Sequence, residues 1–175
     1  GSLGLFLLDG FGVTWMLATL GGRRVLMHGG STNGQQSAFL LLPDEGFGIT
    51  VLTNAAEGAI LAEETVQWVL DRLYGLTLPE PTPIALSPGE LTAYAGNYES
   101  GTGANFEVVE NQGALSLNVT VNGEPLPGGS GPLIMVDTDR AVFDFAGMPF
   151  LTDFLRDDAG NVSWVRFSGR LSPRV

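Results

Sequence analysis

The sequence predicts an α+β chain in which antiparallel strands and one helix precede a small all-β antiparallel barrel. Three observations support this fold class. Apolar runs separated by glycine-rich turns fill the first part of the chain and lead into one stretch of helical periodicity. Prolines then crowd residues 78–88, too densely for a helix or a central strand. From Gly89 onward, short alternating runs recur with turn signals about every 8–12 residues.

The strands of the first part are expected from their apolar content. The turns between them contain Gly10, Gly12, Gly21 and Gly22, and later Pro43 to Gly46. Because the runs are nearly continuous in apolar residues, we expect both faces of this sheet to be covered. The predicted strands are Leu3–Leu8, Val13–Leu20, Arg23–Met27, Phe39–Leu42 and Ile49–Leu52.

A helix is expected over residues 58–74. Its apolar stripe recurs at spacings of three and four residues, and Gly75 is a plausible C-terminal stop. The stripe consists of Ala62, Val66, Val69, Leu70 and Leu73.

The proline-rich stretch sets the predicted domain boundaries, because proline at this density forms a semi-rigid linker. We place the first domain at residues 1–77, the linker at 78–89 and the barrel at 90–175. The barrel should have seven or eight short strands. Its core is expected to contain Phe106, Leu115, Leu117, Val119, Phe143, Phe145, Phe154, Trp164 and Phe167.

Composition excludes several function classes. The net charge of −11 disfavours nucleic acid and anionic lipid surfaces as partners. The chain has no Cys and no Lys, so it has no thiolate or lysine chemistry of its own. No apolar run is long enough for a membrane-spanning helix. We expect no cofactor and no metal. The start at Gly1, within a strand-like run and without Met, suggests a piece of a longer protein.

The segment from His28 to Gly34 is the most unusual local sequence, because it holds the only histidine beside two glycines and a Ser-Thr-Asn run. Glycines let another backbone or a ligand approach closely. A plain glycine-rich hairpin turn is the alternative interpretation.

This segment also carries a resemblance. His28-Gly29-Gly30-Ser31, with Leu3-Gly4-Leu5 before it and Phe39–Pro43 and Gly48–Asn54 after it, resembles the C-terminal third of the serine β-lactamase-like hydrolases. That family includes class C β-lactamases, penicillin-binding proteins, D-stereospecific peptidases and esterases. The second module, with Tyr94-Ala95-Gly96-Asn97-Tyr98, resembles the lipocalin-like β-barrel domain often appended to such enzymes.

The resemblance implies a fragment of a serine acyl-transfer hydrolase that acts on an amide or ester. His28 would take the place of the family's third-motif lysine, and the Ser31 backbone N–H would serve the oxyanion hole. Gly29 and Gly30 would line the substrate. The Ser-x-x-Lys nucleophile is absent, so whether the chain counts as an enzyme is uncertain and alone it should be inactive. Bacterial, periplasmic or secreted localisation is implied by the family alone.

Partners implied by this interpretation are the missing N-terminal part of the catalytic domain and, in the parent, a small acyl substrate. Self-association through the N-terminal sheet is a further expectation, because truncation leaves apolar faces and an edge unpaired. A different function class stays open: a non-catalytic barrel that binds a small apolar ligand or peptide, or mediates oligomerisation.

Other candidate residues have plainer interpretations. Two aspartate groups do not match a calcium-loop spacing and are expected to be turn acids. Three tryptophans lie in apolar surroundings and are expected in the core. The aspartates are Asp137, Asp139 and Asp144, and Asp153, Asp157 and Asp158; the tryptophans are Trp15, Trp68 and Trp164.

Overall fold

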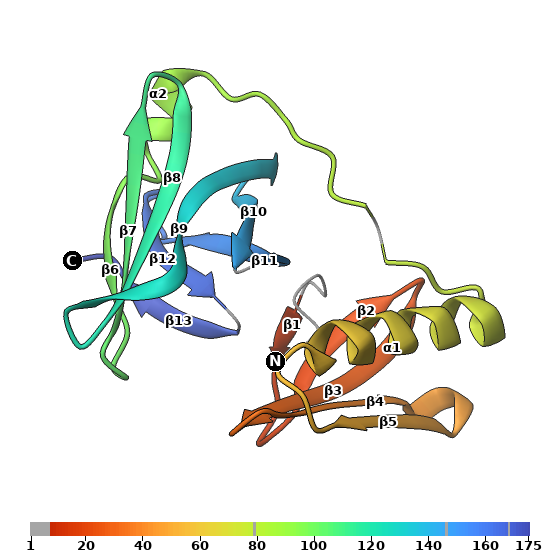
Figure 1. Ribbon diagram of the computed structural model, residues 1–175. Helices are drawn as coiled ribbons and strands as arrows, with labels where there is room; N and C mark the ends of the chain where they lie inside the picture. Colours follow the sequence, from red (N-terminus) through yellow and green to blue (C-terminus); the bar gives the residue numbers. More distant parts are fainter. Residues whose placement is uncertain (1–7, 79, 146, 168) are drawn as a thin grey trace. The chain divides into compact units, whose positions relative to one another are not determined.

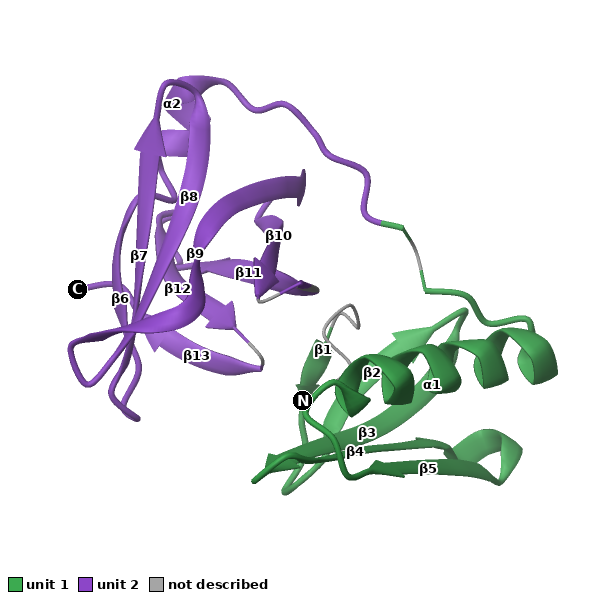
Figure 2. Cartoon of the chain, viewed as in Figure 1, with its two compact units in different colours: residues 1–80 green, residues 81–175 purple. Residues whose placement is uncertain are grey.

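The computed structural model describes residues 8–78, 80–145, 147–167 and 169–175. The chain divides into two compact units, Gly1–Glu80 and Pro81–Val175, coloured separately in Figure 2. Among the described residues, no helix is long and apolar enough to cross a membrane.

Unit 1 is an antiparallel sheet with a helix on one face, as Figure 1 shows. The strands neighbour one another in chain order, so every connection is a short hairpin. They are β1 (Leu8–Phe11), β2 (Met16–Leu20), β3 (Arg23–Thr32), β4 (Gln35–Leu42) and β5 (Phe47–Thr53), and the helix α1 is Gly58–Tyr74.

The core of unit 1 lies between α1 and the sheet. Met27 and Leu40, paired across β3 and β4, are fully buried, and Val66 and Leu70 of α1 are buried with them. Alternation along the strands sends the intervening residues to the opposite face of the sheet. No described element of unit 1 covers that open face, where Leu52 is 74% exposed. The expectation that both faces are covered is therefore wrong for this unit.

Several predicted elements of unit 1 need correction. The strand expected at Val13–Leu20 begins only at Met16, and Val13 is 98% exposed. The strand expected to end at Met27 continues to Thr32. The α1 bounds match the prediction, but Leu73 faces solvent at 61% exposure and does not join the core stripe. Most of the predicted strand Leu3–Leu8 lies outside the described residues.

Unit 2 is an eight-stranded antiparallel sheet that curls until its ends nearly meet. An antiparallel bridge joins Tyr98 to Arg174, and the Val175 N–H donates to the Asn97 carbonyl at 2.9 Å. The coarse prediction of a barrel after an α+β region is compatible with this fold. The strands are β6 (Gly96–Glu99), β7 (Ala104–Asn111), β8 (Ala114–Val121), β9 (Glu124–Asp137), β10 (Arg140–Phe145), β11 (Met148–Arg156), β12 (Val162–Phe167) and β13 (Arg170–Pro173).

Aromatic side chains fill the interior of this sheet. The Phe167 ring lies 5.3 Å from that of Phe106 and 6.1 Å from that of Phe143, which is fully buried. The predicted core residues pack into or against this cluster except Trp164. A register shift between Leu155 and Arg156 changes the alternation along β12 and turns Val165 inward instead.

The chain between the sheets becomes part of unit 2 before the predicted barrel start at residue 90. The Ile84 N–H donates to the Met135 carbonyl of β9 at 2.9 Å, and Leu86 packs against the barrel core. Ser87 then caps the short helix α2 (Pro88–Thr92) in a capping box with Glu90. The domain boundaries stay a prediction, although residues 84–92 are fastened to unit 2.

Candidate functional site

The most distinctive feature of unit 1 is a strand edge that opens halfway along β3. The β2 strand pairs with β3 only as far as Met16 opposite Met27. The pairing of β3 with β4 continues to Thr32 opposite Gln35. Residues His28–Thr32 therefore have a strand on one side and, among the described residues, none on the other. We call this segment the β3 edge.

A tight turn before β2 creates this opening. The chain leaves β1 at Phe11 and reverses so that the Gly12 N–H donates to the Trp15 carbonyl at 2.9 Å. This reversal ends the β2 ladder at Met16. At its far end β3 turns into β4 through Asn33 and Gly34, whose φ angles of 46° and 78° suit a two-residue hairpin. The predicted glycine-rich turn is thus confined to these two residues, and the His-Gly-Gly-Ser segment is strand.

The four predicted site residues are consecutive in the β3 edge but alternate between its faces. His28 is exposed on the open face, beside Phe39 of β4. Gly30 shares that face, and a Cβ atom there would lie 2.8 Å from the Ser37 hydroxyl. Gly29 and Ser31 belong to the opposite face, and the Ser31 hydroxyl accepts a hydrogen bond from Gln36 Nε2 at 2.9 Å. The structure thus places an imidazole and a hydroxyl on opposite faces of one open edge.

An aromatic pair that the sequence analysis did not single out accompanies this edge. The ring of Trp15 lies 5.4 Å from that of Phe39. Trp15 precedes β2 and Phe39 lies in β4, on the two sides of β3, and both are half-buried. Trp15 is therefore not the enclosed core residue expected. The alternation of side chains along β4 could have placed Phe39 on the open face from the sequence alone, because its neighbours Ala38 and Leu40 face the helix.

The open face also carries a two-bonded ion pair, at the end of β3 distant from His28. Arg24 donates to both oxygens of Asp44, at 2.6 and 3.1 Å. This hydrogen-bonded contact lowers the pKa of Asp44. Both side chains are exposed, so the pair adds little stability.

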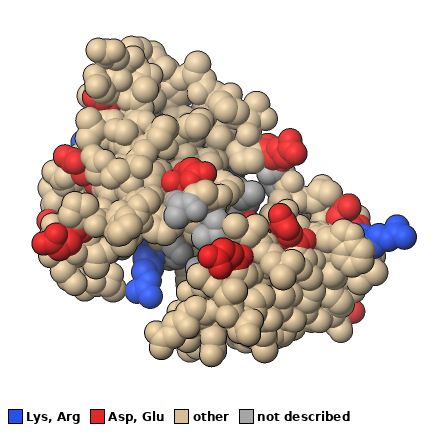
Figure 3. Space-filling model, viewed as in Figure 1, with Lys and Arg blue, Asp and Glu red and all other residues tan. Residues whose placement is uncertain are grey.

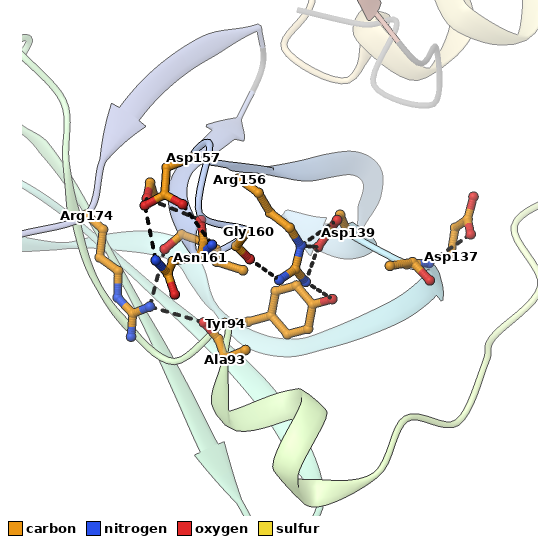
Figure 4. A network of polar contacts seen from close by, with 12 residues as sticks. Ala93, Tyr94, Asp137, Asp139, Arg156, Asp157, Gly160, Asn161 and Arg174 are labelled. Atoms are coloured by element: carbon orange, nitrogen blue, oxygen red, sulfur yellow. Dashed lines mark hydrogen bonds and ion pairs between the residues drawn. The ribbon is translucent and has the colours of Figure 1, made fainter.

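In unit 2, aspartates considered for calcium instead accept hydrogen bonds from turn N–H groups or from arginine side chains. Figure 4 shows Asp139 accepting from Arg156, at 2.7 to 3.0 Å. Asp157 accepts from the backbone N–H groups of Ala159 and Asn161, which lowers its pKa. Asp153 pairs with Arg166. Within the described part of the chain, no three metal-ligating side chains form a group.

Neither the family models nor the curated proteins contain a match to this chain. Two solved structures match over 98% of it: one of SurE with D-Leu and one of SurE, each with a TM-score of 0.65 and 23% identity. The chain spans only 40% and 39% of those chains. An octameric penicillin-binding protein homologue from Pyrococcus abyssi matches with a TM-score of 0.37 and 19% identity over 93% of this chain and 36% of its own. The first two matches establish a shared fold, and the third is too weak to carry an argument.

These comparisons correct the predicted family. The two structures that match over 98% of the chain with a TM-score of 0.65 are of SurE. The assignment to the serine β-lactamase-like hydrolases is therefore not supported, and we withdraw it together with the acyl-transfer function. The hydrolase roles inferred for His28 and for the Ser31 N–H lose their basis with it. The geometry of the β3 edge does not depend on that assignment.

Proposed function

We propose that unit 1 is a peptide-binding module that adds an extended peptide as a strand to the β3 edge. The observation that carries the proposal is the early end of β2, which leaves His28–Thr32 paired on one side only as far as the described strands go. Unpaired strand edges are templates for another chain, and natural proteins either cover them or use them for binding.

The residues of the edge suit a close approach by a second backbone. Gly29 and Gly30 have no side chains to lean over the incoming strand. The Trp15–Phe39 pair offers an apolar platform on the open face, so an aliphatic peptide side chain would pack there. His28 and Ser31 would add polar contacts, one on each face.

The fold neighbours give this proposal its ligand class. One SurE structure is described as containing D-Leu, whose side chain is branched and aliphatic. We therefore choose a leucine-containing peptide, in both epimers, as the ligand for the aromatic pair.

The filled interior of unit 2 gives no comparable support to ligand binding by the barrel. Phe143, Phe167 and Phe106 occupy the space that a ligand would need. Self-association through the N-terminal sheet stays a proposal. It would use the same unpaired edge, so a second copy would compete with a peptide for it.

The test is amide hydrogen exchange by NMR with acetyl-Ala-Leu-Ala-methylamide, in the L- and D-leucine forms. Strand addition should slow alternate amides within His28–Thr32, because successive N–H groups point to opposite edges. A control peptide of the same sequence, methylated at its internal amide nitrogens, cannot complete the ladder and should not protect these amides. Equal protection by the test peptide and this methylated control, or protection confined to unit 2, would refute the proposal.

A variant pair locates the side-chain contact. Phe39→Ala should weaken binding about fivefold, which corresponds to about 1 kcal/mol for an aromatic contact. Phe11→Ala removes the same side chain from β1, away from the β3 edge, and should leave the affinity unchanged. Sedimentation at several protein concentrations separates peptide binding from self-association, which the peptide should reverse if both use this edge.

A further inference from the structure

The outer face of α1 carries an exposed apolar surface that the peptide site does not use. Trp68 is 66% exposed, Leu61 58% and Ile60 47%. Trp68 is therefore not the core residue expected from the sequence. Large exposed aromatic side chains are a frequent centre of protein interfaces. α1 covers the sheet face opposite the one that carries His28, so this surface is separate from the β3 edge.

A groove runs beside Trp68 where the chain turns back after the helix. Gly75 ends α1 with a φ of 62°, and Thr77 and Leu78 then lie beside Trp68. The groove has a volume of about 320 Å³ and is lined by Glu64, Gln67, Trp68, Asp71, Thr77 and Leu78. We call it the α1 groove.

The charges of the α1 groove are of one sign. Glu64 and Asp71 precede and follow Trp68 by four and three residues, so all three lie on one face of the helix. Neither carboxylate belongs to any ion pair found between described residues. Arg72 follows Asp71 in the chain but is not among the lining residues. The side-chain amide of Gln67 donates a hydrogen bond to the Glu63 carboxylate at 3.3 Å.

We propose that the α1 groove binds an arginine side chain of a basic, partly apolar segment of another protein. A guanidinium stacks on the face of an indole and is attracted by its π-electrons. Two flanking carboxylates accept its N–H groups, and Leu78 and Leu61 offer apolar contacts to the residues on either side. The net charge of −11 attracts a basic segment from a distance.

The experiment is a titration of the chain with Ac-Leu-Arg-Leu-NH2, followed by the NMR signal of the Trp68 indole N–H. The matched probe Ac-Leu-Cit-Leu-NH2 replaces the guanidinium by a neutral urea of the same shape. We expect the arginine peptide to bind at least about tenfold more tightly, because the cation contacts both the ring and the carboxylates. Its affinity should fall as salt is raised. Equal binding of the two peptides would overturn the proposal.

Variants separate the groove from the general negative charge and from the β3 edge. Glu64→Gln with Asp71→Asn should weaken arginine-peptide binding about 5- to 20-fold. Trp68→Ala, followed by the backbone amide signals of Asp71 and Thr77 because the indole signal is lost, should weaken it by a similar factor. Glu99→Gln with Glu124→Gln removes the same charge from exposed positions of unit 2 and should change the affinity less than twofold. Phe39→Ala should have no effect. A loss of binding in that variant, or in the unit 2 pair, would contradict the groove as the site.

Discussion

The two units use the same antiparallel strand alternation but differ in whether the sheet returns to itself. In unit 2 the sheet curls until β13 meets β6, so its inward residues face one another across a filled interior. In unit 1 the sheet stays open, with β1 and β5 at its ends and a helix on one face. Closure consumes both the edges and one face of a sheet, whereas the described strands of the open sheet keep one face and one edge uncovered. This difference explains why the candidate binding features lie in unit 1.

The largest expected difference between the two units is in the loss of stability when one phenylalanine is removed from each. Phe143→Ala should destabilise unit 2 by about 3–5 kcal/mol, because it leaves a cavity in a closed interior. Phe39→Ala should cost unit 1 about 1 kcal/mol or less, because its side chain lies on the open face. Chemical denaturation followed by amide NMR signals of each unit measures both values. Similar costs in the two units would mean that the open face of unit 1 is in fact enclosed.

A smaller loss of stability is expected when a side-chain hydrogen-bond network of unit 2 is broken. Arg156 donates to both Asp139 oxygens, to the Gly160 carbonyl at 2.8 Å and to the Tyr94 hydroxyl at 3.2 Å. Its contact with Asp139 raises the pKa of Arg156. Arg156→Met should cost unit 2 about 1–3 kcal/mol, since it leaves several acceptors unpaired.

Arg140→Met is the control for this network. Arg140 makes a single long contact of 3.8 Å with Asp137, so its loss should cost less than about 0.5 kcal/mol. Thermal unfolding of unit 2 in both variants compares them directly. If the Arg140 variant proved as unstable as the Arg156 variant, net charge rather than the network would account for the effect.

The smallest expected effect concerns Glu63, a half-buried carboxyl of α1. Burial raises its pKa from 4.5 to about 6. The raised pKa means that Glu63 favours folding below pH 4.5, and this contribution is lost as the pH rises through about 6. Glu63→Gln should therefore stabilise unit 1 at pH 7 by at most about 1 kcal/mol, allowing for solvent screening, and have no effect at pH 4.

Denaturation of unit 1 at the two pH values gives the sign of this effect. A stabilisation by Glu63→Gln that is equal at pH 4 and pH 7 would exclude titration as its cause.

Structural elements that depend on neighbouring residues in the sequence could be predicted. Those that depend on which strands pair, and over what length, could not. Periodicity gave α1 its bounds because apolar residues at three- and four-residue spacing have one structural solution. The Asn33-Gly34 turn was equally local. The β3 edge was not predictable, because it depends on where β2 stops pairing, and no residue within His28–Thr32 encodes that. Trp68 was misplaced for a related reason: the same helix has apolar residues on its outer face, and composition does not tell which face the sheet covers.

The neighbour-to-neighbour strand order of both sheets has a consequence for how the chain folds. Nearly every pairing joins strands that follow each other in the chain, so each hairpin can form with little loop-closure entropy. The bridge between Tyr98 and Arg174 is different, because it joins β6, the first strand of unit 2, to the residue that follows β13, the last strand. Its contacts form only after the intervening strands have brought the two ends together. The last few residues of unit 2 must therefore leave the ribosome before its barrel can close, whereas the described strands of unit 1 can all pair once β5 has emerged.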